Sequence, residues 1–171
     1  NQSGFNFSKL TILNAPHVKA YNFSLNSYPL FINNTLNITN SVVAGGLSIT
    51  SKELFLQNST ITTGAVYFEP TNIITDTLSI VSSGIRSRII NISVTNITLD
   101  SNSYLSTNEL GYATASGTWG SHGGKYSGGG LIYDSAYQPN MLGSPGYDYT
   151  GYYGGGLIRI VGKNVNILGN L

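Results

Sequence analysis

The sequence predicts an all-β protein, a right-handed parallel β-helix (β-solenoid) with a Gly/Tyr-rich loop region inserted in it. Strand-forming Ile, Val, Thr, Tyr and Phe are plentiful, while good helix formers are scarce. Apolar and polar residues alternate over many stretches, as in IINISVTNITL (89–99), and a period of two is typical of half-buried strands. A short pattern also recurs along the chain, which indicates stacked coils.

The recurring pattern is an apolar residue, any residue, Ile or Leu, any residue, and then a turn residue. Successive copies start 26, 18, 24 and 19 residues apart, and an uneven period near 20 is typical of a solenoid. An antiparallel sandwich also has short strands, but its Asn-Gly or Asp-Gly hairpin signals do not occur here. Parallel crossovers are overwhelmingly right-handed, which predicts the hand. The copies cover 10–18, 36–44, 54–62, 78–86 and 97–105, with a partial sixth at 165–171.

Each copy predicts two interior positions and one turn position. We expect the apolar positions to stack as two interior ladders, formed by Leu36, Leu54, Leu78 and Ile97 and by Ile38, Leu56, Ile80 and Leu99. Asn tolerates a left-handed backbone, so stacked Asn side chains are expected to bridge successive coils. The turn residues are Asn14, Asn40, Asn58, Ser82, Ser101 and Gly169.

A long excursion separates the fifth and sixth copies. Residues 111–156 hold most of the Gly and eight of the 12 Tyr, which is unlike a flexible Gly/Ser linker. We therefore expect solenoid coils over 1–110, the Gly/Tyr-rich excursion over 111–156, and a continuation of the solenoid over 157–171. A Gly/Tyr surface without charge is a good interface. We assign self-assembly contacts to Trp119, Tyr126, Tyr133, Tyr137, Tyr147, Tyr149, Tyr152 and Tyr153.

Composition excludes several classes of function. Charged residues make up 9% of the chain, against about 25% in an ordinary soluble protein, and the net charge is +1. No basic face is therefore available for nucleic acid, and the short apolar runs argue against membrane insertion. The absence of Cys removes disulfides and thiolate metal sites. We expect no cofactor and no metal.

Motifs for catalysis are weak. In GSHGGKYSGGG (120–130), Tyr126 follows Gly124-Lys125 where a phosphate-binding loop needs Ser or Thr, and Trp119 replaces its first Gly. His122 lies beside Ser121, but sequence proximity alone is poor evidence for a catalytic triad. The acidic residues are isolated, although stacked coils could bring two of them together, for instance Asp76 and Asp100. We therefore predict that the chain is not an enzyme.

Sequons for N-glycosylation are the strongest functional signal. The first 100 residues hold thirteen Asn and 25 Ser or Thr, so chance gives roughly three Asn-X-Ser/Thr sequons, and eight occur there. A strand places Asn and the Ser or Thr two residues later on the same face. The alternation of an Asn/Thr-rich solenoid could itself generate sequons, and this alternative stays open. The predicted sites are Asn6, Asn22, Asn33, Asn37, Asn91 and Asn96, with Asn58 at a turn and Asn1 at the chain end.

The glycine-rich part of the chain has a family resemblance. GSHGGKYSGGG, YDSAYQP, GSPG and YYGGGLIRI, followed by VNILGN, resemble the glycine-rich module of large extracellular β-solenoid surface proteins of single-celled eukaryotes. The resemblance covers about 111–171. Pro145 replaces a Gly of the module, and Leu168-Gly169 replaces its usual Asp-Gly turn. The resemblance implies an extracellular, structural or adhesive role and no catalytic residues.

The leading hypothesis is a structural extracellular glycoprotein at the cell surface, whose solenoid assembles into a filament, coat or adhesive fibre. Its expected partners are other copies of itself and covalent N-linked glycans. Two alternatives are a carbohydrate-active β-helix enzyme, which needs carboxylates converging in a groove, and a sugar-binding adhesin module, which needs exposed aromatic rings beside Asp or Asn. Neither end of the chain carries a solenoid cap. We therefore expect more chain or a neighbouring copy to cover both ends.

Overall fold

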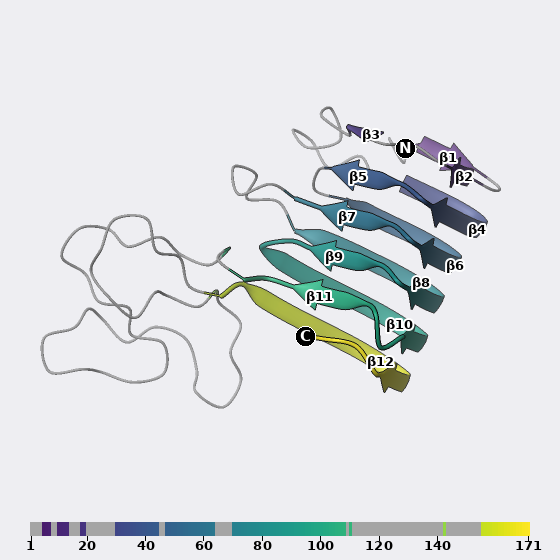
Figure 1. The fold of residues 1–171 in the computed structure, drawn as a ribbon. Helices are drawn as coiled ribbons and strands as arrows, with labels where there is room; N and C mark the ends of the chain where they lie inside the picture. The colour runs from purple at the N-terminus through teal and green to yellow at the C-terminus, as the bar shows by residue number, and fades with distance from the viewer. Residues whose placement is uncertain are drawn as a thin grey trace, which may run out of the picture. The chain divides into compact units, whose positions relative to one another are not determined.

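The fold is all-β, with parallel strands stacked as a β-solenoid (Figure 1). The computed structural model describes residues 5–7, 10–13, 18–19, 30–44, 47–63, 70–108, 110, 142 and 155–171. No helix occurs among these residues. The chain divides into two compact units, one formed by 1–106 with 158–171 and the other by 107–157. The first unit contains the stacked sheets.

Two sheets form the walls of the solenoid. The larger sheet has the order β1-β4-β6-β8-β10-β12, with β2 also beside β4, and the smaller has the order β11-β9-β7-β5-β3. The long strands β4, β6, β8 and β10 are each followed in the chain by a short strand of the second sheet, so the chain passes from one sheet to the other within each of these coils. The long-sheet strands are β1 (Phe5–Phe7), β2 (Leu10–Leu13), β4 (Leu30–Thr39), β6 (Ser48–Gln57), β8 (Thr71–Val81), β10 (Ile89–Leu99) and β12 (Leu157–Ile167). The short strands are β3 (Val18–Lys19), β5 (Val42–Ala44), β7 (Thr60–Thr62), β9 (Gly84–Arg86) and β11 (Tyr104–Ser106).

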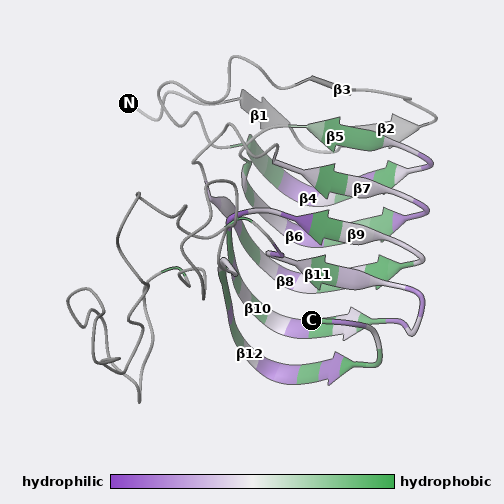
Figure 2. Cartoon of the chain, turned by 60° about the vertical axis from the view of Figure 1, so that its left-hand side comes forward, coloured by the Kyte–Doolittle hydropathy of each residue, from purple (hydrophilic) through white to green (hydrophobic). Residues whose placement is uncertain are grey.

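The two predicted interior ladders are confirmed. Parallel register joins Leu36 to Leu54 and Leu54 to Leu78, and Ile97 completes this column. The second column is joined by the same three strand pairings and consists of Ile38, Leu56, Ile80 and Leu99. None of the eight side chains in the two columns is more than 1% exposed. The short sheet adds a third buried column, seen in Figure 2 as apolar stripes that line up from β5 to β11. It consists of Val43, Ile61, Ile85 and Leu105.

Each long strand bends in its middle, where the inward–outward alternation is interrupted. In β6 both Ser51 and Leu54 are buried, although they are three residues apart, and Lys52 and Glu53 between them are exposed. The same interruption occurs in β8 and β10, and Figure 2 shows the resulting curve along β12. β4 has one residue more at this point, which shifts its register with β6. The bends therefore lie above one another in successive coils.

The turns after the long strands use the predicted residues in three coils. Asn40, Asn58 and Ser82 have φ values of 49°, 47° and 47°, in the left-handed region. The Asn58 side-chain amide donates a hydrogen bond of 3.2 Å to Asn40 Oδ1, so the expected Asn bridge between coils is confirmed. The φ values are positive because the chain reverses within two residues there.

The turn after β10 differs from the prediction at Ser101. Leu99 and the next buried serine, Ser103, are one residue further apart than Ile80 and Ser83 in the preceding coil. The turn residues are Ser101 and Asn102, and neither has a positive φ. In the next coil, a Cβ on Gly169 would lie 2.2 Å from the Ser103 backbone oxygen, so the close approach of two backbones requires glycine there. Right-handed coiling stays a prediction.

Candidate functional site

The β12 edge of the long sheet carries core-facing side chains that no further strand covers among the described residues. The Asn164 side chain donates to Asn96 Oδ1 at 2.6 Å, and the Leu168 N–H donates to Leu99 O at 2.9 Å. These bonds place Val165 beside Ile97, at the end of the first interior ladder. Ile97 is 1% exposed, whereas Val165 is 50% exposed. Since β12 is the last strand in the order of its sheet, this difference marks an open end of the core.

Other β12 residues extend this open end. Three of its isoleucines pack against the core on one side and remain only half-buried, in contrast to their fully buried counterparts on β10. An edge strand also presents backbone N–H and C=O groups with no strand beyond it. Apolar side chains next to unpaired backbone groups form a surface that fits another parallel strand. We call the set Ile158, Ile160, Val165 and Ile167 the β12 end surface.

A buried serine ladder runs beside the turns, and it was not predicted from the sequence. The Ser41 N–H donates to Ser59 Oγ at 3.1 Å, the Ser59 N–H to Ser83 Oγ at 3.0 Å, and the Ser83 N–H to Ser103 Oγ at 3.1 Å. Each of these four side chains is buried. The hydroxyls of Ser59 and Ser83 donate in turn to backbone oxygens two residues earlier, at 2.7 Å. The signal was present in the sequence, because a Ser directly follows the turn residue in three coils, after Asn40, Asn58 and Ser82.

Asp100 lies in the turn before Ser103, the last serine of this ladder, and accepts hydrogen bonds there. Its two carboxylate oxygens each lie 3.1 Å from the backbone nitrogen of Ser82, and its Oδ1 accepts a hydrogen bond from the Ser103 hydroxyl. The Ser103 hydrogen bond is the main reason that the pKa of Asp100 lies below its ordinary value. The backbone N–H groups of Ser82 and Asn102 act in the same direction, and burial opposes them. Asp100 therefore has a structural role in the turn.

Five of the predicted glycosylation sites lie among residues with described side chains. Asn33, Asn58 and Asn96 are exposed, and Asn37 and Asn91 are half-buried on the outer face of the long sheet. Asn6 lies in β1, and its backbone pairs with that of β4. Asn1 and Asn22 lie outside the described residues. Glycosylation at all eight positions stays a prediction.

Besides Asn58, which donates to Asn40 Oδ1, two of these asparagines make side-chain contacts across strands. The Asn91 amide nitrogen donates to Asn72 Oδ1 at 3.0 Å, and Asn96 accepts the bond from Asn164 noted above. An Asn that carries a glycan keeps its carbonyl oxygen and one N–H. Both contacts are therefore compatible with a sugar on the amide nitrogen.

The other predicted features have different outcomes. The eight aromatic residues assigned to self-assembly, from Trp119 to Tyr153, lie outside the described residues. Asp76 and Asp100 do not converge, because Asp76 is exposed at the bend of β8 and Asp100 follows the far end of β10. Among the described residues, no group of three or more His, Cys, Asp or Glu side chains could hold a metal ion. The same part of the chain contains no helix that could span a membrane.

Comparison with known proteins gives no relative. No family model, no curated protein and no solved structure matches this chain.

Proposed function

We propose that this chain is a segment of a structural extracellular glycoprotein, secreted or at the cell surface, whose β-solenoid assembles end to end into a filament, coat or adhesive fibre. The observation that carries the proposal is the β12 end surface, where a core column changes from 1% exposure at Ile97 to 50% at Val165. Another coil with the same apolar pattern would cover this surface and pair with the free backbone groups of β12.

The opposite end of the long sheet offers a matching strand. β2 pairs with β4 in parallel, with Leu10 in register with Leu36 and Ile12 in register with Ile38, so the backbone register of both interior columns extends to β2. A head-to-tail contact would place β12 of one copy beside the β1 and β2 end of the next copy. Such a contact uses two different surfaces and therefore generates an open chain of copies.

Three further features support an extracellular structural role. The sequons are concentrated in the solenoid coils, and glycans there would block lateral association of the nearly uncharged sheets. The absence of Cys leaves rigidity to the ladder of backbone hydrogen bonds. The resemblance of 111–171 to the glycine-rich module of extracellular solenoid proteins has the same implication. This role requires no catalytic residue and no cofactor, and the aromatic residues of the excursion would add contacts between copies.

Substitution of one β12 side chain tests the assembly. Val165→Lys places a charge in the column that another coil would bury, so we expect it to abolish concentration-dependent association. Val161→Lys is the matched control, because Val161 is exposed on the same strand and faces outward, next to the core-facing Ile160. Sedimentation velocity of the native glycosylated protein and both variants gives the comparison. Equal association of all three proteins would contradict the proposal.

A further inference from the structure

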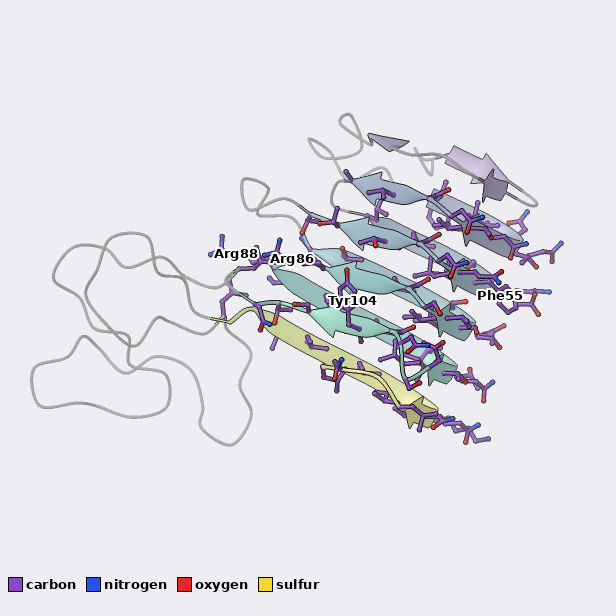
Figure 3. The ribbon with its side chains drawn as sticks, in the orientation of Figure 1. Phe55, Arg86, Arg88 and Tyr104 are labelled. Atoms are coloured by element: carbon purple, nitrogen blue, oxygen red, sulfur yellow. The ribbon has the colours of Figure 1, made fainter. Side chains whose placement is uncertain are left out.

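An exposed aromatic ring lies directly beside one of the sequons. Phe55 in β6 is 38% exposed and points away from the sheet into solvent (Figure 3). Its register partner on β4 is Asn37, the acceptor of the sequon Asn37-Ile38-Thr39. The flanking Leu36, Ile38, Leu54 and Leu56 are buried, so Asn37 and Phe55 both face outward.

The surroundings of Phe55 leave part of its ring exposed to solvent. Ser79, its register partner on β8, is small, and Glu53 and Gln57 on the same face of β6 are exposed and polar. Adjacent parallel strands lie about 4.8 Å apart, so a group attached to Asn37 starts within reach of the ring. Single exposed apolar side chains are ordinary on protein surfaces, so the ring is of interest because a sequon lies beside it.

We propose that the first sugar of an N-linked glycan on Asn37 packs its C–H face against the Phe55 ring. This inference rests on the proposed function, because it requires a glycosylated protein. Attachment joins the anomeric carbon of a glycosyl pyrophosphate donor to Asn37 Nδ2. The amide nitrogen loses one proton, and the pyrophosphate leaves with the bonding electron pair. The linkage keeps one N–H and holds the sugar close to the sheet, where the electron-rich ring face attracts its polarised C–H groups.

Two other sequons of the long sheet, at Asn91 and Asn96, provide an internal comparison, whereas Asn6 in β1 also has an aromatic register partner, Phe31. Among the described side chains, Asn91 pairs in register with Asn72, and Asn96 pairs with Thr77. Neither of these neighbours is aromatic. The contact therefore distinguishes the Asn37 glycan from those on Asn91 and Asn96, and removal of the Asn96 sequon is a matched control.

A double-mutant cycle tests the contact on the full secreted chain. Thr39→Val removes the sequon but keeps Asn37, and Phe55→Ser removes the ring. Thr98→Val removes the Asn96 sequon as the control. Mass spectrometry of the peptide containing Asn37 reports its occupancy, and the melting temperature is measured for each variant, with unglycosylated bacterial protein giving the baseline.

We expect Thr39→Val to lower the melting temperature of the glycosylated protein by about 2–5 °C more than that of the unglycosylated protein. The additional loss of melting temperature in the glycosylated protein should vanish when Phe55→Ser is also present. The change of melting temperature caused by Thr98→Val should be the same with and without Phe55→Ser. If Asn37 carries a glycan and the excess persists with Phe55→Ser, the contact is wrong while the glycoprotein proposal stands. An unoccupied Asn37 also overturns the contact, and a protein without glycans at any sequon overturns both. If Phe55→Ser abolishes association of the unglycosylated protein, Phe55 contacts a second copy and the inference fails.

Discussion

The ring of Tyr104 lies against the backbone of Gly84 on the adjacent strand of the short sheet (Figure 3). A Cβ on Gly84 would lie 2.1 Å from Tyr104 Cζ and 2.4 Å from Cε1. Gly84 does not have a positive φ, so glycine is needed there for space and not for backbone conformation. An aromatic side chain that covers a glycine on a neighbouring strand shields the exposed backbone and fixes register. The Tyr104–Gly84 pair therefore joins the last two short strands.

This pair predicts a coupled effect of substitution. Gly84→Ala should lower the free energy of unfolding by about 1 kcal/mol, because the Tyr104 ring must move away from the sheet. In the presence of Tyr104→Ala, the same change should be neutral or stabilising, since Ala is favoured over Gly in a strand by about 0.5–1 kcal/mol. Urea denaturation of the four proteins measures the coupling. An equal cost of Gly84→Ala in both backgrounds would show that the ring is not the reason for the glycine.

The serine ladder predicts a second stability effect. Ser83→Ala removes the acceptor of the Ser59 N–H and leaves that buried donor without its partner. We expect a loss of about 1–3 kcal/mol in the free energy of unfolding, because an unsatisfied buried donor costs its full desolvation. The matched control is Ser79→Ala, which truncates a half-exposed serine on the outer face of β8 and should change stability by about 0.5 kcal/mol or less. A similar loss in the two variants would contradict the role of the ladder.

Much of the fold follows from the sequence, because burial in a solenoid is periodic. The copies at 36, 54, 78 and 97 place Leu or Ile at the same two positions, and the observed register joins those positions. Sequence spacing could not predict the turn after Leu99. There Asp100 takes over the role of a left-handed turn residue by accepting hydrogen bonds from Ser82 and Ser103.

The candidate site was harder to predict, because it depends on which strands lack a neighbour. Val165 resembles Leu54 in the pattern of its copy, and only the strand order shows that one is at an edge and the other is enclosed. The position of Phe55 beside Asn37 likewise depends on register between coils of unequal length. The sequons themselves needed no structure to be recognised.

Asp100 predicts a pH dependence of stability. The pKa of this carboxyl is lowered in the folded protein, chiefly by the Ser103 hydrogen bond, relative to about 3.9 in the unfolded chain. Because the folded pKa is the lower one, the carboxylate stabilises the fold fully above about pH 4, and this contribution is lost as the pH falls through the folded pKa.

We expect Asp100→Asn to melt at a lower temperature than the unsubstituted protein at pH 6, and the difference should shrink as the pH falls toward 2. Ser101→Ala, in the same turn and exposed, is the control and should keep the original pH dependence. Melting temperatures measured between pH 6 and pH 2 test this. A constant difference between the Asp100→Asn and unsubstituted proteins across that range would contradict it.

Hydrogen–deuterium exchange along β12 tests the central claim, that another coil pairs with this edge. The measurement compares the native protein at low and high concentration, with Val165→Lys alongside. We expect the β12 amides that point away from β10 to become protected as concentration rises, and Val165→Lys to remove this gain in protection. Exchange of those amides at the same rate at every concentration, in protein that nevertheless forms assemblies, would contradict pairing at β12.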